Sequence, residues 1–426
     1  MAYIFLIITI ICILFYCAFF IRSRTWLLLD SFFLGVALYQ IGACTLLLEV
    51  GWDAQSVLIV ATSSACFFIS CLACAILRKP IAKGVLRLDS DRSLNKFERP
   101  LTIAAMLFLI LSNVFLSYIL IIKFLDIFLM MESGFLLDIR KKISSGERGF
   151  LAPGLIKQIR DIISPAILCY AIIFFRGRGA FILPATLFTL IVFSTTIGGQ
   201  RLPIVILAGV IFVSLFYYRA KDWRRKYYFF WIGGFFGLIS ISVLNILLGR
   251  SETEVGFIYS LYNTLEGIVW RAVQVVPFEN YASVPFLMEM EFSPFSIWLQ
   301  ELSSIIPGIK SSLSSELHAN LGGSYEGNSV LGAALASYFN AGYLGVVIYT
   351  LYSILLLAFM ELLFIKTRSK LLLALRIVLF FQIPIWYTPF LAILNGGLVF
   401  AFFVVLLIVY KSAVSLNKPI SPAGVK

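Results

Sequence analysis

The sequence predicts an all-α, polytopic integral membrane protein, and three observations support this prediction. Hydrophobic residues make up 61% of the 426 residues, and only 13% are charged. A soluble domain carries about 25% charged residues, so this chain has too few to cover a water-facing surface. Apolar runs also recur along the whole sequence, many of them near the roughly 20 residues that a membrane-spanning helix needs. We therefore expect most of the surface to face lipid.

Apolar segments number about eleven, and we interpret each as a transmembrane helix. The fifth segment is short. The ninth is long and contains Gly342 and Gly345, where we expect the helix to break or tilt. The segments are 2–21, 26–48, 56–77, 101–122, 162–175, 180–198, 202–218, 227–248, 330–363, 371–390 and 392–410.

The charges between the segments predict the orientation. The chain carries a formal net charge of +12, and its basic residues collect in alternate connections. The connection after the third segment is strongly basic, whereas the one before it holds Glu49 and Asp53 and no basic residue. Because basic connections stay in the cytoplasm, the N-terminus is predicted outside and the C-terminus inside. The net charge therefore needs no nucleic-acid partner to explain it.

Two long connections are predicted on the outer side, at 123–161 and at 249–329. The chain thus divides into eight transmembrane helices in 1–248, a large extracytoplasmic loop in 249–329, and three helices with a cytoplasmic tail in 330–426. The large loop has three basic and nine acidic residues, interleaved aromatic residues and the only histidine, His318. Its stretch 292–306 has helical periodicity, which predicts an amphipathic helix that lies in the membrane interface, acts as a lid, or packs within the loop.

Several kinds of chemistry lack their usual motifs. The sequence has no Gly-rich phosphate loop ending in Lys-Ser/Thr and no H-E-x-x-H. Asp89 and Asp91 have D-x-D spacing, but they lie in a basic cytoplasmic connection. Cys71 and Cys74 have C-x-x-C spacing within an apolar run that offers no histidine or acidic ligand. We therefore predict no metal, no cofactor and no nucleic acid.

Arginines on the predicted outer side are the strongest candidates for chemistry. Arg201, Arg250 and Arg271 lie where the cytoplasmic bias of basic residues does not explain them. The guanidinium group offers a rigid fork of donors that suits a pyrophosphate, such as a lipid headgroup at this depth. The alternative is that each arginine snorkels to the interface or pairs with a glutamate. His318 is either structural or a general base, and the loop glutamates are further candidates for the base.

Three stretches resemble a known family, the bacterial oligosaccharide repeat-unit polymerases (Wzy-type). The first is Arg140 within Leu137-Asp138-Ile139-Arg140-Lys141-Lys142, and the second is Gly199-Gln200-Arg201. The third is the small-residue stretch 322–328 leading into Ser337-Tyr338-Phe339-Asn340-Ala341-Gly342-Tyr343-Leu344-Gly345, which is similar to the family's Phe/Tyr-Asn-x-Gly-x-x-Gly. One departure is that the spacing of Arg, ten residues, then Gly, which some members show in both outer loops, does not occur here.

The resemblance implies an architecture, a reaction and site residues. It implies a GT-C-like glycosyltransferase of the bacterial inner membrane, with its active site facing the periplasm. A growing glycan on undecaprenyl pyrophosphate would be transferred en bloc to a lipid-linked repeat unit, without nucleotide or metal, in a membrane that also holds a chain-length regulator. The implied site residues are His318, Glu279 and Arg271 as catalytic groups; Arg201, Arg140 and Arg250 for pyrophosphate; and Trp270, Tyr281, Tyr325 and Asn328 for glycan.

Three other functions stay open. An O-antigen ligase would use the same lipid carrier but transfer the polysaccharide to lipid A core. A lipid-linked oligosaccharide flippase or other transporter usually places more charge at the bilayer midplane than Asp30, Glu361 and Arg376 provide here. A structural membrane partner of an export complex is the third.

Overall fold

The computed structural model describes nine stretches of the chain and two single residues in detail. They are residues 2–23, 26–90, 159–174, 202–214, 257–290, 292–303, 312–321, 331–367 and 370–383, together with Phe402 and Leu406. Within these residues the protein is helical apart from short connections, and no strand occurs among them. The all-α class is therefore confirmed.

Four long helices form the body of the described structure: α1 (Ala2–Ser23), α2 (Leu28–Val50), α3 (Ala54–Ser90) and α15 (Ala333–Thr367). Three segments are long and apolar enough to cross a membrane, namely Leu28–Val50, Ala54–Lys83 and Ala333–Ile365. This supports a membrane-associated protein. Three of the predicted spans, 101–122, 180–198 and 227–248, lie outside the described residues, as does nearly all of 392–410.

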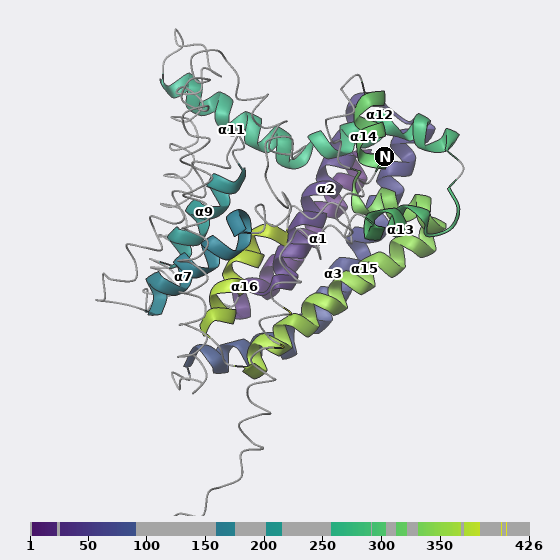
Figure 1. The fold of residues 1–426 in the computed structure, drawn as a ribbon. Helices are drawn as coiled ribbons and strands as arrows, with labels where there is room; N and C mark the ends of the chain where they lie inside the picture. The colour runs from purple at the N-terminus through teal and green to yellow at the C-terminus, as the bar shows by residue number, and fades with distance from the viewer. Residues whose placement is uncertain are drawn as a thin grey trace, which may run out of the picture.

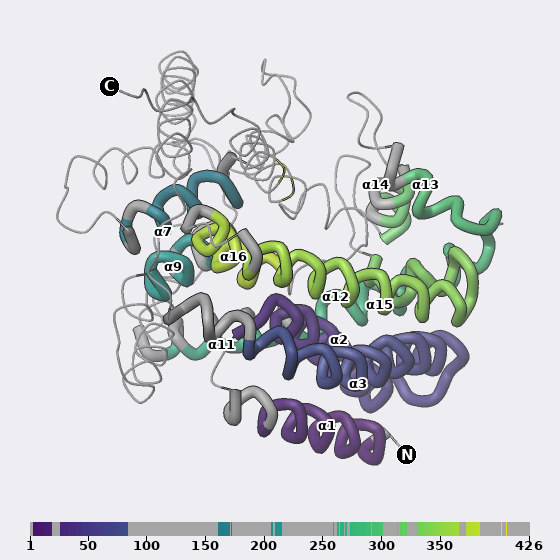
Figure 2. Tube along the Cα trace, turned by 90° about the horizontal axis from the view of Figure 1, so that it is seen from below, coloured from purple at the N-terminus to yellow at the C-terminus, as the bar shows by residue number. Residues whose placement is uncertain are grey.

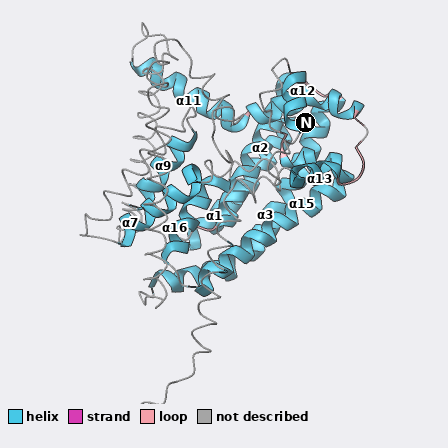
Figure 3. Ribbon diagram, viewed as in Figure 1, coloured by secondary structure: helices cyan, strands magenta, loops and turns pink. Residues whose placement is uncertain are grey.

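Shorter helices complete the described part on two sides. A π-helical turn, η2 (Ile159–Ile163), leads into α7 (Ser164–Phe174), which packs with α9 (Leu202–Phe212) and α16 (Lys370–Gln382). The predicted large outer loop contains α11 (Phe257–Val273), α12 (Val275–Glu289), α13 (Ser296–Ser303) and α14 (Ser312–Asn320). Figure 1 shows α12, α13 and α14 gathered at one end of the long helices, with α11 running across the molecule to meet α12. The same helices are drawn by secondary structure in Figure 3.

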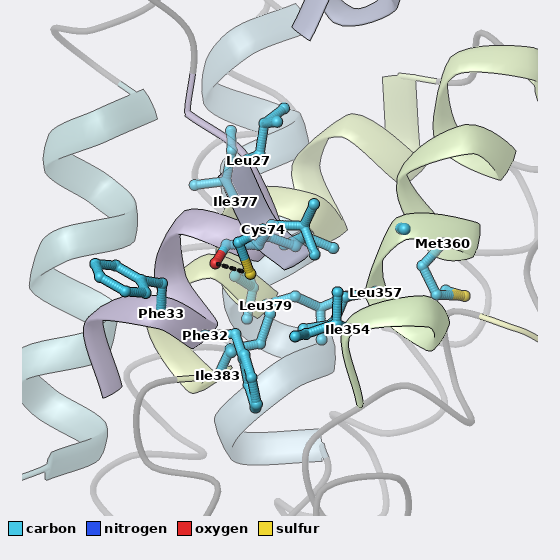
Figure 4. Close-up of a cluster of buried hydrophobic side chains, with 14 of the residues drawn as sticks. Leu27, Phe32, Phe33, Cys74, Ile354, Leu357, Met360, Ile377, Leu379 and Ile383 are labelled. Atoms are coloured by element: carbon cyan, nitrogen blue, oxygen red, sulfur yellow. Dashed lines mark hydrogen bonds between the residues drawn. The ribbon is translucent and has the colours of Figure 1, made fainter. Parts of the chain in front are cut away.

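The long helices lie side by side because each places small or apolar side chains against its neighbours. Figure 2 shows α1, α3 and α15 running next to one another, with α16 following α15 toward α7 and α9. One core cluster joins them, including Phe67, Cys74, Leu357 and Leu379, all buried. Figure 4 shows this cluster, in which the Cys74 thiol donates to the carbonyl of Leu29 at 3.9 Å. Since lipid tails are as apolar as leucine, such packing stabilises a membrane bundle mainly by van der Waals contact.

Two buried ion pairs hold the connection between α1 and α2. Arg78 on α3 donates through Nε to Oδ1 of Asp30 at 2.7 Å and through Nη2 to Oδ2 at 3.2 Å, while the hydroxyl of Tyr16 donates to Oδ1 at 2.7 Å. The backbone N–H of Leu27 donates to Oδ2 of the same carboxylate at 2.8 Å. Asp30 stands in the first turn of α2, where a carboxylate also satisfies the free N–H groups of a helix start.

The second ion pair binds the same connection with residues from the C-terminal part of the chain. Arg376 on α16 donates to Oε2 of Glu361 at 2.8 Å, and it also donates to the carbonyl of Trp26. Oε1 of Glu361 accepts from the N–H of Leu28 at 2.7 Å. Asp30, Glu361 and Arg376, which the sequence marked as intramembrane charges, are thus paired near helix ends.

Candidate functional site

The helices of the predicted outer loop form a layer that packs on the ends of α2, α3 and α15. Its core contains Val284 and Leu287 from α12, Ile297 from α13, and Leu313 and Leu317 from α14, packed against Leu46, Ile59 and Leu335 of the long helices. We call α12, α13 and α14 the end layer. Because its apolar side chains enter a shared core, its position relative to the bundle is set by packing.

The end layer brings two predicted catalytic positions onto neighbouring helices. Glu279 lies on α12 and His318 on α14, and these helices contact each other. Leu317, next to His318, is buried in the interface. The side chain of His318 lies outside the described residues. The side chain of Glu279 is partly exposed. The backbone carbonyl of Glu279 accepts a hydrogen bond from the hydroxyl of Ser283 at 2.7 Å.

Trp270 and Arg271, two further predicted site residues, lie near the end of α11. The indole of Trp270 is 52% exposed, which suits a side chain that contacts a ligand or lipid. The side chain of Arg271 is outside the described residues. So are Arg140, Arg201, Arg250, Tyr325 and Asn328, although Arg201 directly precedes α9 in the chain.

Tyr281 is used in a contact between the end layer and α3. Its hydroxyl donates to Oδ2 of Asp53 at 2.6 Å, and Oδ1 of Asp53 accepts from the backbone N–H of Ser56 at 2.7 Å. The hydrogen bond from Tyr281, followed by those from Ser56, lowers the pKa of Asp53 below its ordinary value of 3.8. The same bond to Asp53 raises the pKa of Tyr281 above 10.0. Tyr281, predicted to bind glycan, therefore has a defined partner within the protein.

Asn280 makes a second contact of this kind, deeper in the structure. Its Nδ2 donates to the hydroxyl oxygen of Tyr39 at 2.6 Å, and its Oδ1 accepts from the N–H of Gly332 at 3.1 Å. A Cβ at Gly332 would lie 2.6 Å from Nδ2 of Asn280, so only glycine allows this approach. Asn280 thereby joins α12, α2 and the start of α15. Asn280 was not among the predicted site residues, because in the sequence it is one of several polar residues of the large outer loop.

The stretch that resembles the family motif forms the joint between α13 and α15. Oδ1 of Asn340 accepts from the N–H groups of Ile297 at 3.1 Å and Trp298 at 3.3 Å, so Asn340 caps α13 from another helix. Its own carbonyl accepts from the N–H of Phe295 at 3.1 Å.

The kink beside Asn340 depends on two glycines. Ala341 and Gly342 leave helical geometry, and Gly342 has φ 62°, a conformation that favours glycine. A Cβ at Gly345 would lie 2.1 Å from the carbonyl oxygen of Ser337. The break that the sequence predicted at these glycines therefore falls at Gly342, and Gly345 permits the backbone to fold closely on itself. We call Asn340–Gly345 the joint.

Metal chemistry finds no ligand cluster in the described part of the chain. No group of three His, Cys, Asp or Glu side chains converges there. Cys71 and Cys74 are free thiols on α3.

Comparison of the whole chain with protein-family models, with curated proteins and with solved structures gives no match. The fold and the contacts define the class, an all-helical membrane-associated protein with a packed helical layer at one end of its bundle.

Proposed function

We propose that the protein polymerises undecaprenyl-pyrophosphate-linked oligosaccharide repeat units into a surface polysaccharide, by en bloc glycosyl transfer at the outer face of the bacterial inner membrane. The observation that carries the proposal is the joint. The residues that resemble the family's Asn-x-Gly-x-x-Gly are the ones that cap α13 and kink α15. These residues have a structural role, because they cap one helix and kink another. A sequence motif with a structural role supports membership of the family more strongly than the same residues in a regular helix would.

In the proposed reaction, a hydroxyl of the acceptor repeat unit attacks the anomeric carbon of the donor glycan. The bond from that carbon to the pyrophosphate oxygen breaks as the new glycosidic bond forms, and the lipid pyrophosphate leaves with the electron pair. Glu279 or His318 accepts the hydroxyl proton. Arg201, Arg140 and Arg250 bind the leaving pyrophosphate, and Arg271 stabilises charge at the reacting centre. The energy comes from the lipid-linked bond, so the reaction requires no nucleotide.

Trp270, Tyr325 and Asn328 are proposed to hold the glycan. Aromatic rings pack on the apolar faces of sugars, while amides and carboxylates bond sugar hydroxyls. The 52% exposure of Trp270 agrees with this role. Tyr281 supports the site by bonding Asp53, and its ring remains partly exposed.

The test is a reaction with defined components. Purified protein in lipid nanodiscs is incubated with a synthetic undecaprenyl-pyrophosphate-linked repeat unit of its host's own polysaccharide, with no nucleotide sugar, and the products are separated on a gel. A ladder of repeat-unit multiples is expected. If no ladder forms, lipid A core is added as acceptor. Transfer to that core would replace the polymerase with the ligase. Appearance of the substrate in the opposite leaflet of proteoliposomes, without bond formation, would replace it with the flippase.

A pair of variants connects the activity to the joint. Asn340→Ala removes the cap of α13, which costs about 0.5–2 kcal/mol of stability, and should strongly reduce the ladder at a temperature where the bundle stays folded. Gly267→Ala is the control, because a Cβ at Gly267 meets nothing within 4 Å. A full ladder from folded Asn340→Ala would separate the joint from the activity.

A further inference from the structure

Helix α11 presents an exposed face that divides into an apolar edge and a polar edge. Tyr262, Leu265 and Val269 follow one another at three and four residues, which places them on one edge of the helix. All three are exposed, Tyr262 by 61%. Asn263 and Glu266 are also exposed and lie toward the other edge, with Tyr259 and Trp270 near them. An exposed face with this division needs an environment that is apolar on one side and wet on the other.

The C-terminal end of α11 packs against the side of α2, below the end of that helix. A Cβ at Gly42 would lie 1.7 Å from the carbonyl oxygen of Val273, so the end of α11 is pressed against the side of α2. Gly42 stands eight residues before Val50, the last residue of α2. At the rise of an α-helix, that is about 12 Å below the end of α2. A helix suspended in water above the membrane would meet α2 only at its end.

Exposed tyrosine and tryptophan side chains gather at this same end of the bundle. Tyr3 at the start of α1 and Trp52 in the connection between α2 and α3 are exposed there, as are Tyr259, Tyr262 and Trp270 on α11. By contrast, α3 exposes Phe68, Leu72 and Ile76 further along its length. Tyrosine and tryptophan favour the level of lipid headgroups, whereas aliphatic side chains and phenylalanine favour the hydrocarbon. The two sets together indicate where the bilayer ends.

We infer that α11 is an interfacial helix, seated in the boundary between lipid headgroups and acyl chains at the end of the bundle that carries the end layer. Tyr262, Leu265 and Val269 point into the acyl chains, while Asn263 and Glu266 face the headgroups and water, and Tyr259 and Trp270 share that polar edge at the level of the headgroups. The partner of the apolar edge is therefore the lipid bilayer itself. The inference does not depend on the proposed reaction.

The first test places a reporter at each edge of α11 in the full-length protein, reconstituted in lipid nanodiscs. A genetically encoded fluorescent amino acid replaces Leu265, and in a matched control it replaces Asn263. Lipids with brominated acyl chains should quench most of the emission at Leu265, and aqueous iodide very little. The pattern should reverse at Asn263. Quenching of both positions by iodide alone would overturn the inference and assign the face to an aqueous ligand, such as a glycan or a protein.

A second test leaves the apolar edge intact. The emission of Trp270 is obtained as the difference between the natural chain and Trp270→Phe, a change at an exposed side chain that conserves an aromatic ring. Bromine near the headgroup end of the acyl chain should quench this emission more than bromine near the methyl end. Emission that is insensitive to both lipids and is lost with iodide would contradict the interfacial position, even if the Leu265 variant failed to fold.

Discussion

The carboxylates of Asp30 and Glu361 are buried, and each accepts hydrogen bonds from an arginine and from a backbone N–H group at the start of α2. Asp30 accepts from Arg78, Tyr16 and the backbone of Leu27. Glu361 accepts from Arg376 and the backbone of Leu28. Removing a charged group from water is expensive, and the expense is offset only when such partners are complete. Each pair therefore stabilises the fold as a unit and destabilises it when one member is missing.

Arg78→Met tests this point at the residue scale. It leaves Asp30 buried without its counter-ion, so we expect a loss of about 3–5 kcal/mol, whereas the double variant Asp30→Leu with Arg78→Met should recover part of it. The measurement is the temperature of aggregation in detergent, followed by size-exclusion chromatography. If the single variant were as stable as the natural protein, the ion pair would have no structural role.

Gly42 shows how one missing methyl group sets the distance between α2 and α11. A Cβ there would overlap the carbonyl of Val273 and approach Pro277 to 2.8 Å. Gly42→Ala should therefore push the start of α12 away from α2 and cost about 1–3 kcal/mol. Gly267→Ala on α11 is the matched change without a clash and should be neutral or stabilise by about 0.5–1 kcal/mol, because it removes a flexible glycine from a helix. Thermal unfolding of both variants in nanodiscs gives the comparison, and equal stability would contradict the close approach.

At this scale, sequence identified charged residues but not their partners. Asp30, Glu361 and Arg376 stood out because charges are rare in apolar segments. Arg78 belongs to the basic connection after the third segment, which the charge pattern predicts to be cytoplasmic. No local sequence feature links Arg78 to Asp30, which lies 48 residues away. Asn280 was likewise an ordinary polar residue in the sequence, and Asn340 stood out only as part of the motif; neither position indicated its partner on another helix.

Among the elements, α12 is attached to α3 by a hydrogen bond with a defined pH range. The lowered pKa of Asp53 means that this carboxylate stabilises the contact above about pH 3.8, and that the contribution is lost as the pH falls through the lowered pKa. The raised pKa of Tyr281 means that the contribution is present below about pH 10 and is lost as the pH rises through the raised value. The contact should therefore be intact throughout the physiological range.

Spectroscopic titration checks this expectation. The absorbance change of tyrosine ionisation in the natural protein, minus that in Tyr281→Phe, isolates Tyr281. We expect its midpoint above pH 10.0 in the natural protein and closer to 10.0 in Asp53→Asn, where no carboxylate accepts the bond. A midpoint that is the same in both proteins would mean that the two side chains do not meet.

The limits of a helix could be predicted only where the helix and its apolar segment end at the same residues. The predicted segment 26–48 corresponds to α2, Leu28–Val50. The sequence predicts that the third transmembrane segment, 56–77, ends before Arg78. Helix α3 instead continues to Ser90 through basic residues and Pro80, because a helix can extend beyond the apolar layer of the membrane. In the predicted outer loop, the stretch 292–306 was expected to be helical. The described helix there, α13, spans eight residues, and it buries Ile297 while Leu299 is exposed.

For the whole molecule, the predicted orientation can be tested by finding the side of the membrane on which α12 lies. The charge pattern predicts the outer side, and Ala282 is exposed on α12 while its neighbour Ser283 is 3% exposed. Ala282→Cys should react with a membrane-impermeant maleimide in intact cells, above the background of the natural cysteines. Ser283→Cys should react only after denaturation. If Ala282→Cys reacts only once the inner membrane is opened, the orientation is the reverse of the predicted one.

At the scale of the molecule, composition sufficed for the class and not for the arrangement. The low charge and the repeated apolar runs predicted an all-helical membrane protein; the described helices confirm the all-helical class and support membrane association. The same composition gave no indication that the predicted outer loop packs as a layer. The contacts that build it, such as Leu317 with the α12 core, join residues far apart in sequence, and apolar periodicity does not identify partners.

The backbone around Leu28 has a consequence for biosynthesis. Its N–H is bonded by Glu361, a residue that the ribosome adds 333 positions later. At roughly 5–20 residues per second, tens of seconds separate the two. During that interval α1, α2 and α3 can enter the membrane and close the Asp30–Arg78 pair, but the connection between α1 and α2 must keep its remaining N–H in contact with water or with the insertion machinery. Helices α15 and α16, which are synthesised late, therefore complete the hydrogen bonding at the start of α2, which is synthesised early.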